Sequence, residues 1–456
     1  MTETKKKRLP LGFYFASSTF ALERGAYYSA KFLIIAYLTT AIVNGGLGLS
    51  TGEAAMLQAN FVAFSFLAPV ICGYISDRWI GARYLIPVGM VIMGVGYYFG
   101  SIATNTFMIN VMIWLVALGT GFFKGNISGV NGQQFDDPDE LDGAFSVQYT
   151  FVNIGSFVGT TATGILYMYT FAQNGVLGFS QCFLISAIAC VFGAVWFAIG
   201  TRFMGDAGKR PFKEGVQVEK VETKEEAKPL TGLEKKRVAA IILVSMFSVI
   251  FWVFWYLTYV AVWDSVDYVN WTISNFTVPV AWFDSLNAFV CIALGPVFAA
   301  LWVKLAKRPQ GDLSLFKKLA LGLSFLGFSF LMLEGVNLTK GDGKASLIWI
   351  LMFGIFLSVG EMLFSPLGNS FITKYAPTKL LGTLLGVWSV ATFIASISYG
   401  YLYDFMSQFN PLVVYSAIPA ILFVAAIILF VGDKGLSSLV ESGEEVEETN
   451  ESVQAV

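Results

Sequence analysis

Histidine is absent from this chain of 456 residues. Without imidazole the chain offers no histidine metal ligand, no Ser-His-Asp triad and no histidine proton relay. The sequence also lacks a GxSxG segment, which would present a hydrolase nucleophile, and a GxxxxGK[ST] segment, which would cradle nucleotide phosphates. We therefore predict no catalytic residue, no metal site, no cofactor and no direct use of ATP, and a membrane enzyme is the least favoured class.

Cysteine and charge are also sparse. The four cysteines, Cys72, Cys182, Cys190 and Cys291, lie inside apolar runs and show no CxxC spacing, so we predict small core residues with no redox or metal role. Charged residues make up 13% of the chain and the formal net charge is −2. This balance argues against a nucleic-acid partner.

Apolar residues are what the chain has in abundance. They account for 56% of it, and the mean hydropathy of +0.66 fits a membrane protein that crosses the bilayer many times. Apolar runs bounded by Gly, Pro and charge predict an all-α membrane protein with about twelve transmembrane helices. The predicted spans lie near 11–42, 55–76, 84–101, 106–131, 145–170, 175–200, 237–263, 279–303, 314–334, 346–373, 382–405 and 411–432.

The distribution of cations predicts how the chain is oriented. Lys340 and Lys344 share one loop, three cations lie within apolar runs, and the other Lys and Arg residues fall on the opposite side. By the positive-inside rule that opposite side is the cytoplasm, and an even number of spans places both termini there. The charged start, MTETKKKRLP, is predicted to be a cytosolic tail and not a cleaved signal peptide. We expect a monomer in the cell (plasma or inner) membrane, surrounded by lipid bilayer.

Changes in composition divide the chain into four parts. We predict a six-helix N-terminal half, a charged cytosolic linker, a six-helix C-terminal half and a disordered acidic tail. These parts span residues 1–200, 201–236, 237–432 and 433–456, respectively.

The two halves share a pattern that indicates an internal duplication. Asn60 stands nine residues before Pro69, and Asn287 stands nine residues before Pro296, at an offset of 227 residues. Each proline is followed by valine, and a charged residue, Asp77 or Lys304, lies eight positions after the proline. Many secondary transporters consist of duplicated halves with binding residues near the membrane midplane.

The first predicted span carries charges that a bilayer opposes. Each charge at the centre of a spanning helix costs about 2.5–3.5 kcal/mol on insertion scales. Glu23, Arg24, Tyr27, Tyr28 and Lys31 fall on one stripe about 140° wide, which we expect to face water or substrate. The alternative is an internally neutralised ion pair that only locks two helices together.

The loop after the second span, Gly73-Tyr-Ile-Ser-Asp77-Arg78-Trp-Ile-Gly81-Ala-Arg83, resembles the signature loop of the major facilitator superfamily. Its glycines permit close helix approach. Asp77, Arg78 and Arg83 are predicted to form a gating charge latch at the cytoplasmic mouth, and the alternative is a static turn with solvated charges.

Four further stretches resemble the proton-dependent oligopeptide transporter family, of which this chain would be an atypical member. Glu23-Arg24 followed by Tyr27-Tyr28 is similar to its first-helix motif ExxERFxYY. The remaining stretches are Gly121-Phe-Phe-Lys124-Gly-Asn126, Tyr149-Thr-Phe-Val-Asn153-Ile-Gly155-Ser156 and Glu361-Met-Leu-Phe-Ser365-Pro366-Leu-Gly368. The resemblance implies the major facilitator fold, with two pseudo-symmetric six-helix bundles and alternating access.

The charges alone suit a zwitterion, because its carrier needs cations at one end of a cavity and a carboxylate at the other. The resemblance implies that the N-terminal cations Arg24, Lys31 and Lys124 bind the carboxylate of a small peptide and that Glu361 binds its amino group. It also implies that Tyr28, Tyr149, Asn153, Trp252, Asn287, Ser365 and Trp388 line the pocket. For Lys124, a buried ammonium among glycines, we predict Glu23 as the partner.

The departures from the family pattern concern proton coupling. Phe20 and Tyr256 stand where the family carries carboxylates, Gly25 replaces a phenylalanine, and Lys31 replaces an arginine. Glu23 and Glu361 remain the candidate proton-coupling groups, since coupled transport needs a group that takes up and releases a proton.

We therefore expect a secondary transporter of di- or tripeptides, or of similar zwitterionic solutes, coupled to protons despite the missing carboxylates. One alternative is an uncoupled or differently coupled facilitator for amino acids, other carboxylates or drug-like solutes. An alternative of another class is a solute sensor on a transporter scaffold.

Overall fold

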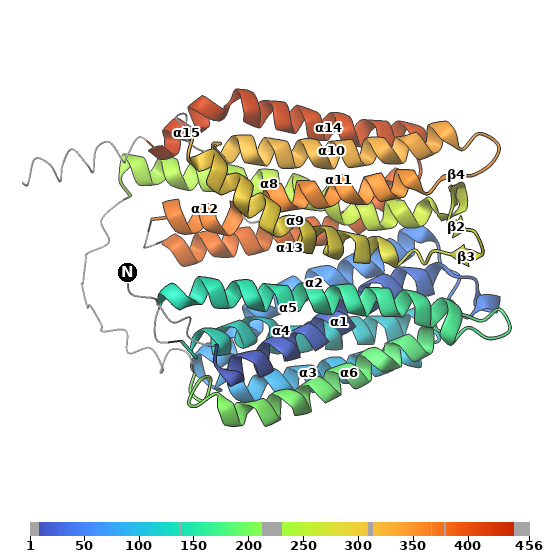
Figure 1. Ribbon diagram of the computed structural model, residues 1–456, viewed down its shortest axis with the longest axis horizontal. Helices are drawn as coiled ribbons and strands as arrows, with labels where there is room; N and C mark the ends of the chain where they lie inside the picture. Colours follow the sequence, from blue (N-terminus) through green and yellow to red (C-terminus); the bar gives the residue numbers. More distant parts are fainter. Residues whose placement is uncertain are drawn as a thin grey trace, which may run out of the picture. The chain divides into compact units, whose positions relative to one another are not determined.

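The computed structural model describes residues 9–135, 138–211, 230–308, 313–365, 367–377 and 380–441, and it is predominantly helical (Figure 1). The chain divides into two compact units. Unit 1 contains Met1–Val221 together with Pro279–Ala288, and unit 2 contains Glu222–Val278 together with Phe289–Val456. The expected linker lies largely in 212–229, outside the described residues.

Among its described residues, unit 1 contains six long helices and the first turns of a seventh. The long helices are α1 (Leu11–Thr39), α2 (Thr51–Arg78), α3 (Ala82–Ser101), α4 (Thr106–Gly132), α5 (Pro138–Ile165) and α6 (Phe179–Gly200). A π-helical stretch, Leu166–Thr170, extends α5, and short 3-10 helices occupy Ile42–Asn44 and Thr201–Phe203. Helix α1 packs against α2, α5 and α6, while α3 and α4 pack against each other.

Glycines allow α1 and α5 to approach closely. A Cβ atom on Gly155 would lie 2.1 Å from the carbonyl oxygen of Ala21, and one on Gly159 would lie 2.4 Å from that of Gly25. These distances leave no room for a side chain, so the two backbones meet directly, as in other small-residue helix contacts within membranes. The departure at Gly25 thus has a packing reason, since its own Cβ would approach the Gly155 carbonyl oxygen to 3.2 Å.

Unit 2 is built mainly from α8 and α10 with the helices around them. Its elements include α8 (Gly232–Asp264), most of α9 (Trp282–Ala306), α10 (Leu315–Thr339), α11 (Ile348–Phe364), α12 (Leu367–Tyr375), α13 (Leu381–Met406), α14 (Pro411–Val431) and α15 (Asp433–Glu441). Helix α10 packs against α11 and α14, and α8 packs against α13.

Short strands follow α8 and precede α11. Strands β1 (Val269–Asn270) and β4 (Ala345–Ser346) pair in parallel, and β2 (Thr272–Ile273) pairs antiparallel with β3 (Phe276–Thr277). A 3-10 turn, Val266–Tyr268, connects α8 to β1. These elements lie at the end of the unit that is predicted to face outside.

The helix lengths confirm the expected all-α fold of about twelve spans. Among the described residues, ten helices are long and apolar enough to cross a membrane. Helix α1 has 29 residues but carries the three charges discussed above, and α11 is an apolar helix of 17 residues. The internal repeat places both of its prolines, Pro69 and Pro296, inside helices α2 and α9.

Two expectations require correction. The span expected at 346–373 is divided between α11 and α12, with Ser365 in the turn that ends α11. Pro366, a residue type that cannot donate a helical hydrogen bond, follows Ser365 in the sequence and lies outside the described residues. The tail expected to be disordered from residue 433 begins instead with α15, because Asp433 bonds to Ser314 and Lys317 at the start of α10. Residues 442–456 lie outside the described residues.

Candidate functional site

The adjacent residues Glu23 and Arg24 of α1 form a buried ion pair with two hydrogen bonds. Arg24 Nε donates to Glu23 Oε2 and Arg24 Nη2 donates to Glu23 Oε1, each at 2.6 Å. The guanidinium also lies 4.4 Å from the centroid of the Tyr27 ring. Glu23 is 0% exposed and Arg24 5%. Both charges are therefore compensated within α1, as the alternative interpretation held, although the pair does not link two helices.

A second buried pair connects α1 to the first turn of α9. Lys31 Nζ lies 3.8 Å from Asp284 Oδ1, and the two side chains are 4% and 5% exposed. The Lys31 ammonium also lies 5.5 Å from the Tyr28 ring centroid. Because Asp284 occupies the first turn of its helix, the positive end of the helix dipole favours its carboxylate.

Asp284 was missed by the sequence reasoning. It was visible there as an acidic residue inside the predicted span 279–303, three positions before Asn287, and an ionisable residue inside a span is a functional candidate by default. The neighbouring Ser285 shares hydrogen bonds with the hydroxyls of Thr160 and Thr161 at 2.9 and 2.8 Å. These bonds fix the start of α9 against α5 within unit 1.

Glu23, the partner predicted for Lys124, forms no ion pair with it in this structure. Glu23 is engaged by Arg24, and among the described residues Lys124 takes part in no ion pair. Its ammonium lies 4.2 Å from the centroid of the Phe66 ring, and the side chain is half-buried. The expected close packing nearby is present, because a Cβ on Gly121 would lie 2.7 Å from Cys72 Sγ and 2.9 Å from Ala68. Lys124 is thus a cation held over a ring in a tightly packed region between α2 and α4.

The other predicted residues of unit 1 lie on α5 and α9. Tyr149 is 57% exposed, and Asn153 is half-buried and donates from Nδ2 to the Tyr149 carbonyl oxygen at 2.9 Å. Asn287 is half-buried on α9. The residues predicted to line the site in unit 1 therefore come from α4, α5 and α9 in addition to Arg24, Tyr28 and Lys31 of α1.

The residues predicted in unit 2 come from α8, α11 and α13. Trp252 packs against Trp255 and Tyr256 with ring centroids 5.3 and 5.9 Å away. Its buried Nε1 has no hydrogen-bond partner in the described part of the chain. Trp388 lies against the backbone of Gly368, where an added Cβ would be 2.0 Å from the indole.

Glu361 and Ser365 lie at the end of α11. Glu361 is half-buried and Ser365 is exposed. The Ser365 amide donates to the Glu361 carbonyl oxygen at 2.8 Å, which closes the last turn. Glu361 is close enough to Cys291 of α9 to act on it electrostatically. Glu361 therefore belongs to the same unit as Trp252 and Trp388, whereas Tyr28 and Tyr149 belong to unit 1.

Aromatic packing fills the positions where the family pattern has carboxylates. Phe20 meets Phe123 edge-on at 5.4 Å between ring centroids and is 6% exposed. Tyr256 is 5% exposed and stacks on Tyr399 at 5.6 Å. Neither position holds a charge, so a protonatable group must be found elsewhere.

The predicted latch residues do not pair with one another in this structure. Arg78 bonds to the hydroxyl of Tyr74 and lies 4.1 Å from its ring centroid. Arg83 donates to the carbonyl oxygen of Gly205 at 2.9 Å. Among the described residues Asp77 forms no ion pair. The gating role of these residues stays a prediction.

In the described part of the chain, no cluster of His, Cys, Asp and Glu residues could hold a metal ion. The four cysteines are buried and free, which matches their predicted place in the core.

Comparisons with known proteins place these observations in a family. The model of the Major Facilitator Superfamily matches residues 24–400. The uncharacterized transporter YclF of Bacillus subtilis (strain 168) is 25% identical over 426 residues, which cover 83% of this chain and 84% of that protein. A di-/tripeptide transporter of Lactococcus lactis subsp. cremoris is 26% identical over 434 residues, covering 81% of this chain and 84% of that protein.

A solved structure shares the fold. The crystal structure of a mutant of the peptide transporter POT in complex with alafosfalin matches with a TM-score of 0.85 at 24% identity, covering 95% of this chain and 96% of that chain. The loop around Asp77 indicated this superfamily from the sequence. The membrane-length helices, the fold and the family match over most of the sequence agree with that prediction. The chain belongs to the Major Facilitator Superfamily of multi-pass membrane transporters.

Proposed function

We propose that this chain is a secondary transporter that moves di- or tripeptides, or similar small zwitterionic solutes, across the membrane by alternating access. The relatives named di-/tripeptide transporter support this substrate class, and so does the alafosfalin-bound peptide transporter with the same fold. Transporters of this superfamily bind substrate between repeated halves and expose it to each side in turn.

The proposal rests mainly on the environment of Lys124, which has no ion pair among the described residues. Of the three cations predicted to bind a peptide carboxylate, Arg24 is engaged by Glu23 and Lys31 faces Asp284. Lys124, in contrast, has no ion pair among the described residues and lies over Phe66. A half-buried ammonium without a counterion is costly, and a substrate carboxylate would compensate it. We assign the substrate carboxylate to Lys124 and its amino group to Glu361 of unit 2.

Proton coupling is assigned to the pair of Lys31 and Asp284. A group that couples transport to protons must hold a proton in one state and release it in another. Glu23 is poorly suited, because two hydrogen bonds of 2.6 Å from the neighbouring Arg24 engage both oxygens of its carboxylate. Asp284 lies 3.8 Å from the Lys31 ammonium and on another helix, so this contact changes when α1 and the start of α9 separate. Protonation of Asp284 would weaken its hold on Lys31 and release the start of α9 from α1.

Uptake of labelled dialanine into proteoliposomes, with and without an inward proton gradient, tests the proposal. We expect the wild-type protein to concentrate dialanine only when the gradient is present. Lys124→Gln and Glu361→Gln should each lower uptake about tenfold or more, since each removes one partner of a charge-assisted contact. Glu334→Gln is the matched control, because Glu334 is also a half-buried acidic residue of unit 2 but lies outside the predicted site.

Other outcomes separate the alternatives. Uptake that only equilibrates would indicate a facilitator, and competition by single amino acids but not by dipeptides would change the substrate class. Saturable binding without any flux would indicate a sensor. Wild-type uptake by folded Glu361→Gln and Lys124→Gln proteins would overturn the site assignment.

A further inference from the structure

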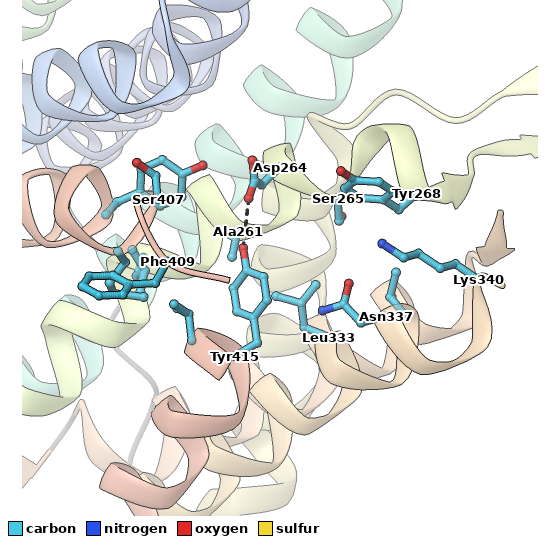
Figure 2. A pocket seen from close by; sticks show the side chains of 15 residues that line it. Ala261, Asp264, Ser265, Tyr268, Leu333, Asn337, Lys340, Ser407, Phe409 and Tyr415 are labelled. Atoms are coloured by element: carbon cyan, nitrogen blue, oxygen red, sulfur yellow. Dashed lines mark hydrogen bonds between the residues drawn. The ribbon is translucent and has the colours of Figure 1, made fainter. Parts of the chain in front are cut away.

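Unit 2 contains a cavity that none of the predicted transport residues lines. It has a volume of about 230 Å³ and lies where α8, α10 and α13 end and α14 begins (Figure 2). Its wall includes the buried side chains of Leu257, Leu333 and Val336. The cavity lies at the end of the unit that is predicted to face outside.

Two opposite charges line this cavity without pairing with each other. Asp264 accepts a hydrogen bond of 3.2 Å from the Tyr415 hydroxyl, and Lys340 Nζ lies 3.8 Å from the centroid of the Tyr268 ring (Figure 2). Within the described residues neither Asp264 nor Lys340 takes part in an ion pair. Both side chains are half-buried, so their charges have lost part of their solvation.

Asn337 adds a third polar group to the wall. Its Nδ2 is buried and has no hydrogen-bond partner among the described residues. A buried amide donor without a partner costs roughly 1–3 kcal/mol. The cavity therefore offers an anion, a cation and a free donor around an apolar wall, which is the composition of a binding site for a small polar molecule.

We propose that this cavity is a separate binding site for a small zwitterion of amino-acid size. The ligand's ammonium would meet Asp264, its carboxylate would meet Lys340 and Asn337, and its side chain would lie against Leu257, Leu333 and Val336. A ligand with only a positive charge would leave the charge of Lys340 uncompensated, and a ligand with only a negative charge would leave that of Asp264 uncompensated. A zwitterion compensates both charges.

The volume limits the ligand to about the size of one amino acid. At about 30 Å³ per water molecule, 230 Å³ holds roughly eight waters, comparable with the nine heavy atoms of leucine. The site thus selects a smaller molecule than the peptides assigned to the transport site. Its occupation is independent of Lys124 and Glu361, so it goes beyond the proposed function.

Equilibrium binding of labelled L-leucine to the purified full-length protein in lipid nanodiscs tests this site. We expect saturable binding to the wild-type protein. Asp264→Asn and Lys340→Gln should each weaken it about tenfold or more. Asp267→Asn and Lys344→Gln are matched controls, since both residues are exposed at the same end of the unit but do not line the cavity. They should bind like the wild type.

Two leucine analogues test the need for both charges. Leucinamide lacks the carboxylate and 4-methylpentanoate lacks the ammonium, so neither should compete with leucine at concentrations where leucine itself does. Tyr415→Phe removes only the hydroxyl that donates to Asp264 and should weaken binding less than Asp264→Asn. It keeps the test decisive if a charge variant fails to fold.

Three results would overturn the proposal. The first is the absence of saturable leucine binding to folded wild-type protein. The second is binding that survives Asp264→Asn and Lys340→Gln but disappears in Glu361→Gln, which would place leucine in the transport site. The third is equal competition by leucinamide, which would show that the carboxylate is not recognised.

Discussion

Helix α1 carries two buried ion pairs that differ in geometry. Glu23 and Arg24 are neighbours in sequence and share two hydrogen bonds of 2.6 Å. Lys31 and Asp284 come from different helices and lie 3.8 Å apart. All four residues are at most 6% exposed.

The difference in geometry indicates that the two ion pairs have different roles. A pair between neighbouring residues of one helix can keep its geometry when helices move, whereas a pair between α1 and α9 changes whenever they separate. The first pair is therefore suited to holding charge permanently inside the membrane, and the second to switching. If this comparison holds, breaking the first should mainly affect stability, and breaking the second should mainly affect coupling.

The largest effect on stability is expected for Glu23→Gln. The substitution leaves the Arg24 guanidinium buried without a carboxylate, and removing one partner of a buried pair costs about 3–5 kcal/mol. Thermal unfolding of the detergent-solubilised protein should show a clearly lower midpoint. Arg24→Lys should also destabilise, because lysine lacks the fork that makes both hydrogen bonds.

Glu53→Gln is the control for this prediction. Glu53 is an exposed residue of the capping box at the start of α2, a position where glutamine also serves. Its unfolding midpoint should match that of the wild type. A Glu23→Gln protein as stable as the wild type would remove the structural role given to the first pair.

Asp284→Asn should have a smaller effect on stability and a larger one on coupling. Its carboxylate lies 3.8 Å from the Lys31 ammonium, whereas Glu23 makes two hydrogen bonds of 2.6 Å, so we expect a loss in the free energy of unfolding below the about 3–5 kcal/mol expected for Glu23→Gln. Asparagine cannot take up and release a proton, so accumulation of dialanine under an inward proton gradient should be lost. Exchange of external for internal dialanine, which needs no net proton movement, should continue.

Asp267→Asn, at an exposed position in the turn after α8, is the matched control and should keep gradient-driven accumulation. If Asp284→Asn still concentrated dialanine as the wild type does, the coupling role would pass back to Glu23 or Glu361. Loss of exchange together with accumulation would instead assign Asp284 to substrate movement itself.

The sequence predicted the fold well because the bilayer imposes a simple rule on composition. Long apolar runs separated by charge determine where spans begin and end, and the loop around Asp77 indicated the superfamily. The charged stripe of α1 was also visible, since Glu23, Arg24 and Lys31 interrupt an apolar run. Only the break within the span 346–373 and the helix at 433–441 differed clearly.

The partners of the charges could not be predicted in the same way. Whether Glu23 meets its neighbour Arg24 or Lys124 of α4 depends on side-chain rotamers and on how α1 packs against α4, which the sequence alone does not give. Asp284 lies 253 positions after Lys31 in the sequence, and no periodicity relates them. The cavity beside Asp264 combines residues from the ends of α8, α10 and α13 and from the start of α14, which are far apart in the sequence.

The smallest effect is expected at a third ion pair, which joins the first turn of α10 to the start of α15. Lys317 Nζ lies 2.9 Å from Asp433 Oδ2, and the lysine side chain is 38% exposed, so solvent screens the pair. Burial of the Asp433 carboxyl favours its neutral form, but hydrogen bonds from Ser314 and Lys317 and the lysine's charge outweigh this and lower its pKa below the usual 3.8.

Asp433→Asn should therefore cost less than about 1 kcal/mol at pH 7, measured as the shift in the unfolding midpoint. A lowered pKa in the folded state contributes stability above the unfolded value of 3.8, and this contribution is lost as the pH falls through the folded value. The midpoints of wild type and variant should thus converge below pH 3.8. Asp206→Asn breaks the ion pair with Lys209, whose side chains are 94% and 47% exposed, respectively. This variant should not change the unfolding midpoint measurably, at pH 7 or below pH 3.8. A larger loss for Asp433→Asn than for Asp284→Asn would contradict the ranking by burial, because it would make the screened contact stronger than the buried one.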